Sequence, residues 1–500
     1  MRTLSTTYRH RSTGIWAWLA LGVGGLGLAL VFALIATSGS PLMVGMAAAL
    51  IVGPLLLLVP ELTIWILLVV GLVLGVLTGS PKFSKLAWGA SLLSMLLLPP
   101  AIINMMWSQE RRLPAFMKIA VLFLVYAVLV TFARWYSLGE FIAGFKRYFQ
   151  AFGLMLALSL IVFPPEAYAR WKKFVLVVAL LQLPFAAFEL FVLVPMRGGL
   201  AHGSEATDVV AGTFGANLDG GSPNAVMVMF LFIALAFLVA RWRAGLLKTG
   251  RFVLLSAICL APLGFGETKI AVVMLPLVGV SLLRKDLMKA PLRYVPALLV
   301  MALLTMALGY IYVVLMMKST PADVIANTLR YNVGDQGYSQ GMVLNRFTSI
   351  TFWFARQGDD LVSFLIGNGL GSSFSSLTSN GHVALKYLNY GINMTAVSTL
   401  LWDVGMIGCL MFISMLVLAW FAAGRLHNEV DDAGVKADAL AIQAALVLFG
   451  LQLVYADSIV NLVSLEIVVA IVLGYLSYLM NLHGLLRVKK AVRAPVRRYA

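Results

Sequence analysis

The sequence predicts an all-α polytopic membrane protein, and three observations carry this prediction. Of the 500 residues, 61% are hydrophobic and only 12% are charged, whereas soluble globular domains carry about 25% charged residues. Apolar runs of about 17 to 25 residues recur along the chain, and a helix of about 20 residues crosses a bilayer core. Basic residues gather between these runs and at both ends of the sequence, as expected of loops that stay in the cytoplasm.

The apolar runs predict about fourteen transmembrane helices when the amino terminus is placed in the cytoplasm. The first run follows Arg2, Arg9 and Arg11 and is too long for a cleaved signal peptide, so we expect a retained signal anchor. Both termini and the strongly basic loops then fall on the cytoplasmic side. The predicted spans are residues 15–36, 42–59, 62–79, 87–106, 115–133, 148–163, 174–195, 223–240, 252–265, 269–283, 294–316, 394–423, 438–457 and 462–482.

The spans divide the chain into four parts. Residues 1–317 form a transmembrane bundle of about 11 helices with an outer loop at 196–223. Residues 318–393 form one large extracytoplasmic loop domain, and 394–482 are the C-terminal transmembrane helices. Residues 483–500 are a basic cytoplasmic tail. Two cysteines, Cys259 and Cys409, lie in apolar runs far apart in sequence, which indicates neither a disulfide framework nor a thiolate metal site.

The outer loop at 318–393 is about 75 residues long, far longer than an ordinary connection, so we expect function there. Its segment 342–355 predicts an amphipathic helix with Phe347 and Phe354 on the apolar face, lying on the membrane or on the bundle. The glycines from Gly367 to Gly371 predict a tight turn with positive φ. A shorter outer segment, 134–147, fits either a plain connection or part of a site.

Six ionisable residues in outer positions are candidates for chemistry. Glu267 and Lys269 fall at a turn between two apolar runs, where each charge would cost about 2.5 to 3.5 kcal/mol if isolated at mid-membrane. They either pair with one another, or Lys269 holds an anionic group that Glu267 orients. Arginine suits phosphate oxygens or lipid headgroups, and this applies to the loop residues Arg330, Arg346 and Arg356. His382 fits a surface histidine or a general base. No cluster has metal-ligand spacing, so no metal is predicted.

Three stretches of the sequence are considered together: 212–215 (GTFG) followed by 222–225 (SPNA), 365–372 (LIGNGLGS), and 400–408 (LLWDVGMIG). Together they resemble the O-antigen ligase and polymerase family. Their order, and their predicted positions in two outer loops and the start of a span, match that family.

The resemblance implies a GT-C-like fold in a bacterial inner membrane and a glycosyltransferase with a polyprenyl-diphosphate-linked glycan as donor. It implies neither a nucleotide sugar nor any cofactor. The stretch 266–271 (GETKIA) looks like the exopolysaccharide-polymerase branch. The family's arginine role carries over to Arg346 and its phosphate-facing cation role to Lys269, while Thr213 and Asn224 lie within the first matching stretch. The family often has a histidine-asparagine pair before the last stretch, but here that position reads Asn-Met-Thr at 393–395.

These expectations define a metal-independent inverting polymerase that joins lipid-linked oligosaccharide repeats at the outer membrane face. Fixed cations would neutralise the diphosphate leaving group, and Arg346, Arg356 and Lys269 are the candidates. The general base is either Glu267 or His382. Substrate contacts are assigned to Lys269, Arg356, Asn224, Thr213 and Arg330. Partners are the donor and acceptor glycans, membrane lipid, a chain-length regulator and an export complex; no nucleic acid is expected.

Three other functions also fit the sequence. An O-antigen ligase would transfer the finished glycan to a lipid acceptor instead of to another repeat. A polytopic transporter or flippase of lipid-linked glycans would use the same spans and intramembrane charges. A non-catalytic scaffold of an export complex is the third alternative.

Overall fold

The computed structural model describes residues 52–75, 86–107, 111–199, 202, 209–219, 221, 223–266, 270–310, 313–314, 320–334, 343–358, 360–375 and 380–486. Regular secondary structure in these ranges is helical throughout, apart from one isolated bridge between Ser375 and Asn380. The predicted all-α class is therefore confirmed for this part of the chain.

The chain divides into two compact units, Met1–Thr63 and Ile64–Ala500. In the first unit the Thr63 hydroxyl donates a hydrogen bond of 2.6 Å to the carbonyl of Leu56, which closes the turn at the start of helix α3 (Pro60–Leu72). The second unit contains the rest of the described helices, and all the sites below lie within it.

Seven described helical segments are long and apolar enough to cross a membrane, or eight if the bent pair Val52–Leu58 and Pro60–Leu72 is one span. The chain is therefore a membrane protein with several spans. The first predicted span, 15–36, lies outside the described residues. The predicted span 148–163 contains only the nine-residue helix α9 (Phe152–Leu160), and 252–265, 269–283 and 294–316 correspond to apolar helices of 10 to 17 residues. A count of fourteen stays a prediction.

The first half of the second unit consists of the helices from α5 to η2. Helix α8 is the polar exception among them, since it begins at the N-cap Ser137 and contains Glu140, Lys146 and Arg147. The elements are α5 (Leu86–Leu96), α6 (Leu98–Trp107), α7 (Ala115–Ala133), α8 (Leu138–Phe149), α9, α10 (Pro165–Phe188), the π-helix η1 (Glu189–Leu193), α11 (Val194–Met196) and the 3-10 helix η2 (Gly212–Phe214).

The second half contains the most buried helices. Side-chain caps start two of them: Thr395 and Ser398 form a capping box at α20, and Asp432 caps α21. The elements are α12 (Asn224–Arg243), α13 (Thr249–Leu260), η3 (Ala261–Gly264), α14 (Ala271–Lys289), η4 (Pro291–Tyr294), α15 (Val295–Tyr310), α16 (Pro321–Val333), α17 (Arg346–Gln357), α18 (Leu361–Ile366), α19 (His382–Lys386), α20 (Ala396–Glu429), α21 (Ala433–Tyr455), η6 (Asp457–Val460) and α22 (Val463–Leu482).

One end of the helices is defined by basic side chains. Asp438, in the first turns of α21, accepts hydrogen bonds from Lys172 on α10 and Arg241 at the end of α12. The backbone N–H of Arg112 donates to Asn481, near the end of α22. We call this the basic end. It joins parts of several loops that the sequence assigns to the cytoplasm.

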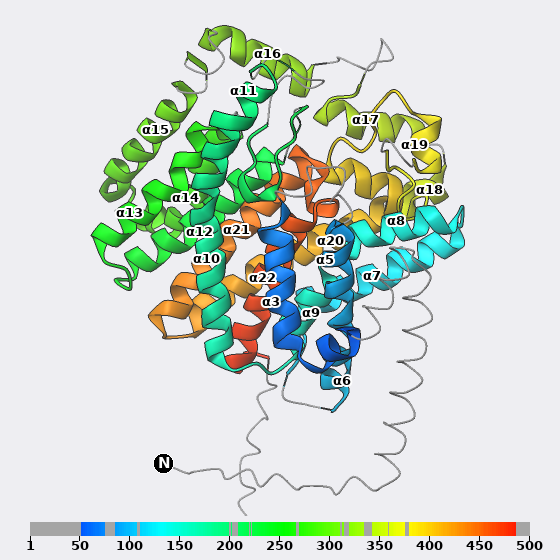
Figure 1. Cartoon of the computed structure of the whole chain (residues 1–500), viewed down its shortest axis with the longest axis horizontal. Helices are drawn as coiled ribbons and strands as arrows, with labels where there is room; N and C mark the ends of the chain where they lie inside the picture. Colours follow the sequence, from blue (N-terminus) through cyan, green and yellow to red (C-terminus); the bar gives the residue numbers. More distant parts are fainter. Residues whose placement is uncertain are drawn as a thin grey trace, which may run out of the picture. The chain divides into compact units, whose positions relative to one another are not determined.

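The opposite end, which we call the loop end, contains α8, α17, α18, α19, η2 and η6. Figure 1 shows α8 and α17 to α19 gathered around the first residues of α20, and α17 and α18 contact that helix. Helix α10 connects the two ends, since it starts near Lys172 and leads to Glu189, which binds the backbone beside η2. The 24 residues of α10 extend over about 36 Å.

Candidate functional site

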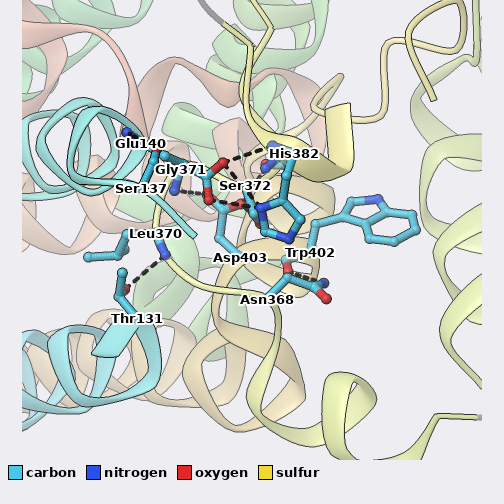
Figure 2. Close-up of polar contacts among 11 residues, drawn as sticks. Thr131, Ser137, Glu140, Asn368, Leu370, Gly371, Ser372, His382, Trp402 and Asp403 are labelled. Atoms are coloured by element: carbon cyan, nitrogen blue, oxygen red, sulfur yellow. Dashed lines mark hydrogen bonds and ion pairs between the residues drawn. The ribbon is translucent and has the colours of Figure 1, made fainter. Parts of the chain in front are cut away.

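A buried carboxylate organises the glycine-rich loop at the loop end. Asp403, on α20 and 1% exposed, accepts hydrogen bonds from the backbone N–H groups of Gly371 at 3.1 Å and Ser373 at 2.8 Å. The hydroxyls of Ser372 and Tyr148 donate to it at 2.8 and 3.0 Å. Figure 2 shows this loop wrapped around Asp403. Because four fixed donors already bind its oxygens, this carboxylate has a structural role.

The glycines are needed because the loop packs into a break in α20. That helix is interrupted at Gly405, where φ is 67°, and the loop uses carbonyl groups near the break: the N–H of Asn368 donates to Trp402 and the N–H of Gly369 donates to Asp403. Gly367 and Gly371 have φ of 82° and 85°, where a side chain would be strained. The predicted tight turn with positive φ is confirmed.

His382 forms a dyad with a carboxylate that the sequence analysis did not select. Its Nδ1 lies 2.9 Å from Oε1 of Glu140 on α8, and its backbone N–H donates to Oε2 of the same residue at 2.8 Å (Figure 2). The ring also stacks on Tyr136 with 4.7 Å between centroids. Because a carboxylate accepts at Nδ1, the hydrogen is assigned to that nitrogen and Nε2 carries the lone pair. The imidazole is therefore oriented as a proton acceptor.

The same helix carries two cations further along: Lys146, whose ammonium lies over the ring of Trp88, and Arg147. Arg147 lies seven residues after Glu140 on the same side of α8, about 10.5 Å along the axis. Its guanidinium lies over the ring of Phe374, and the carbonyl of Phe374 accepts from the N–H of Gly381, the residue before His382. Burial lowers the pKa of Arg147 to about 10, with Asp457 opposing the shift. Burial and the neighbouring Arg147 also lower the pKa of Lys146.

Asp457 faces Arg147 from η6, between α21 and α22. Burial raises its pKa to about 6, while Arg147 and a hydrogen bond from Asn461 at 2.9 Å oppose that shift. We call Glu140, His382, Lys146, Arg147 and Asp457 the loop-end site. It combines an oriented base with two cations on one helix, which suits a reaction that moves a proton next to an anionic group.

The predicted arginines lie beside this site or away from it. Arg346 starts α17 and is half-buried; its Nε donates to the carbonyl of Tyr455 at 2.5 Å, its Nη1 donates to Asn332, and its guanidinium lies over the Tyr455 ring. It therefore contacts the chain two residues before Asp457. Arg356 is exposed at the end of α17, with its guanidinium 5.4 Å from the centroid of Phe352.

The first matching stretch forms a second buried polar cluster. The Thr213 hydroxyl donates to the carbonyl of Leu72 at 2.7 Å and accepts from Gln182 at 2.6 Å. Glu189 accepts from the N–H groups beside it at Ala211 and Gly212. These contacts make Thr213 an anchor of η2. Asn224, at the start of α12, is also buried, with 1% of its surface exposed. The substrate contacts predicted for Thr213 and Asn224 remain predictions.

The side chains of three predicted site residues lie outside the described part of the structure. Glu267 and Lys269 lie outside the described residues, and of Arg330 only the backbone within α16 is described. Their predicted roles stay untested.

Four residues of the site were not among those predicted from the sequence: Glu140, Lys146, Arg147 and Asp457. A signal for the first three exists, because Ser137 and Glu140 have the spacing of a helix start and Lys146 and Arg147 follow in the last turn. A short polar helix in this segment is thereby predictable. Asp457 has no such signal, since its importance comes from Arg147, which lies about 300 residues away in the chain.

In the described part of the chain, no group of three or more His, Cys, Asp or Glu side chains is arranged to hold a metal ion. Cys259 and Cys409 are free and buried. Neither the protein-family models nor the curated proteins compared with this chain give a match.

Proposed function

We propose that this protein is a membrane glycosyltransferase that polymerises polyprenyl-diphosphate-linked oligosaccharide repeats at the outer face of a bacterial inner membrane. The observation that carries the proposal is the Glu140–His382 pair, in which one carboxylate binds both the backbone and the ring of the histidine. An oriented base whose partner Glu140 lies two turns of α8 from Arg147, on an apolar helix bundle, suits a lipid-linked anionic donor. The resemblance of three sequence stretches to the O-antigen ligase and polymerase family points the same way.

The reaction is a single displacement with inversion. A hydroxyl of the acceptor glycan attacks the anomeric carbon of the donor, and its proton passes to Nε2 of His382. The new bond joins that oxygen to the anomeric carbon, while the bond from carbon to diphosphate oxygen breaks and polyprenyl diphosphate leaves with the electron pair. Arg147 and Lys146 stabilise the charge that develops on the diphosphate.

The proposal includes a topology of about fourteen spans with the loop end outside and the basic end in the cytoplasm, because basic loops stay inside. Glu267 and Lys269, which the sequence places between η3 and α14, are proposed to belong to the same outer side. His382 is the proposed base, and Lys269 and Arg346 are proposed to add to the cationic lining.

The test measures chain elongation by the purified full-length protein in detergent. Its substrate is the lipid-linked single repeat that accumulates in a deletion strain. We expect His382→Gln to reduce the elongation rate by about 10² to 10⁴-fold, the usual contribution of general-base catalysis. His202→Gln is the matched control, because His202 is exposed and lies in the other long outer loop.

Elongation at the normal rate by His382→Gln would contradict the assigned base. Wild-type protein that leaves single repeats unextended in detergent, yet moves them between leaflets of a vesicle, would support the transporter instead. Accumulation of finished chains rather than single repeats on deletion would indicate the ligase.

A further inference from the structure

The basic end contains an apolar cavity of about 400 Å³. Five helices contribute to its wall, and this volume falls within the range of about 300 to 1,000 Å³ that is usual for ligand sites. Packed interiors rarely leave voids larger than a water molecule, so such a space is a candidate for an occupant. Representative lining residues are Leu68 on α3, Leu158 on α9, Leu176 on α10, Phe237 on α12 and Val472 on α22.

The depth of the cavity matches one leaflet of a bilayer. Its lining on α12 extends from Phe230 to Arg241, which corresponds to about 16 Å of helix, and a bilayer core is about 30 Å thick. Cavities lined by apolar side chains stay free of water and bind apolar molecules. The shape and chemistry therefore suit a hydrocarbon chain that enters from one leaflet.

The mouth of the cavity is positively charged. Lys172, Lys173 and Arg241 line it, and the described lining residues include no carboxylate. Asp438, next to the mouth, accepts from Lys172 at 3.2 Å and from Arg241 at 2.9 Å. With Lys173 the mouth has three cations and one neighbouring carboxylate, which leaves two positive charges. The side chains of Lys172 and Arg241 are 36% and 38% exposed, and Lys173 is exposed. An anionic group can reach all three.

We propose that this cavity binds one anionic phospholipid, with an acyl chain between α10, α12 and α22 and its phosphate against Lys173, Lys172 and Arg241. A zwitterionic lipid would bring its own cation to a mouth that already has excess positive charge. The lipid site is separate from the loop-end site, because it lies at the opposite end of α10, and it does not depend on the proposed transfer reaction.

Native mass spectrometry of the full-length protein tests this proposal. The protein is purified in detergent and offered equal amounts of phosphatidylglycerol and phosphatidylcholine. We expect a one-to-one adduct with phosphatidylglycerol that exceeds the phosphatidylcholine adduct at least about fivefold, since one basic residue near an anionic headgroup contributes about that factor.

Two variants separate the headgroup from the chain. Lys173→Gln is expected to lower the preference for phosphatidylglycerol about fivefold; Lys248→Gln, an exposed lysine outside the lining, is its control. Ala234→Phe places a ring in the cavity and is expected to abolish both adducts, whereas Ala257→Phe at an exposed position of α13 leaves them unchanged.

Equal retention of the two lipids by the wild type would overturn the proposal, as would adducts with detergent or inorganic phosphate in place of phospholipid. An unchanged preference in Lys173→Gln would also overturn it. Lys173 makes no contact with Asp438 among the described pairs, so this variant decides the question even if Ala234→Phe does not fold.

Discussion

Two carboxylates from different helices hold the same long segment between α18 and α20, and they do so in different ways. Asp403 on α20 is buried and receives four hydrogen bonds from fixed backbone and hydroxyl donors. Glu140 on α8 is 8% exposed by its side chain and receives its described side-chain hydrogen bonds from a single residue, His382, whose side chain is 29% exposed. A buried carboxylate whose oxygens accept four hydrogen bonds serves to position the loop. One that orients a partly exposed imidazole leaves a second nitrogen free for proton transfer.

The largest expected effect concerns the structural carboxylate. Asp403→Ala leaves the N–H groups of Gly371 and Ser373 and the hydroxyl of Tyr148 without their acceptor in a buried place. We expect the free energy of unfolding to fall by about 3 to 5 kcal/mol, as for other broken buried networks. Thermal unfolding in detergent measures this loss.

The control for this variant is Asp432→Ala, which removes an N-cap at the start of α21 and is expected to cost only about 1 kcal/mol. Equal melting temperatures of Asp403→Ala and the wild type would show that the loop does not depend on this carboxylate.

Glu140→Gln tests the second carboxylate. The amide can donate to Nδ1 of His382, which favours the tautomer with hydrogen on the outward Nε2, and that tautomer cannot accept a proton. We expect kcat for elongation to fall about 10²-fold, at the lower end of the general-base contribution, with KM and melting temperature almost unchanged. In the double variant with His382→Gln, no further loss is expected; an additive loss would mean that Glu140 acts independently of the histidine.

Some of this arrangement was predictable because it is local. Apolar runs located α7, α12, α20 and α22 to within a few residues, since a membrane span needs a continuous hydrophobic segment. The turn glycines were predictable because positive φ favours glycine. By contrast, the pairing of Glu140 with His382 joins residues 242 positions apart. A contact over such a distance in the chain cannot be predicted from the pattern of residues in a single sequence.

Helix α17 shows a second limit of sequence reasoning. Its predicted apolar face includes Phe347 and Phe354, but these are 55% and 47% exposed, while Thr348, Ser349 and Trp353 are buried. In a soluble protein the apolar face points to the core, whereas next to a bilayer it can point to lipid. The alternation of polar and apolar residues therefore identified the helix, but it left open which of its faces packs on the protein.

Arg147→Gln tests whether the cations serve the donor. Removing a charge-assisted hydrogen bond to a diphosphate is expected to raise the KM for the lipid-linked donor about tenfold or more, with a smaller change in kcat than in Glu140→Gln. Arg356→Gln is the matched control, since Arg356 is exposed and contacts the Phe352 ring, and we expect less than about a threefold change for an exposed charge. The reverse order of effects would transfer the donor contact to α17.

The smallest expected effect concerns Asp457, which competes with the donor for Arg147. Burial raises its pKa from the ordinary 3.8 to about 6, so the carboxyl is neutral below pH 6 and ionised above it. When neutral, it leaves the charge of Arg147 to the donor; we therefore expect the donor KM to rise about threefold between pH 5 and pH 7 in the wild type, a change of under 1 kcal/mol. Because the pKa is raised on folding, its stabilising contribution is complete below about pH 3.8 and is lost as the pH rises through about 6.

Asp457→Asn keeps the volume of the side chain and removes its titration. We expect a low donor KM that is constant from pH 5 to pH 7, and a melting temperature that no longer falls across the same range. Reading KM separates this effect from the proposed proton transfer to His382, which acts on kcat because the histidine serves the chemical step. If the variant kept the wild-type slope of KM against pH, Asp457 would have no influence on donor binding. Its interaction with Arg147 would then serve the structure alone, like the hydrogen bonds to Asp403.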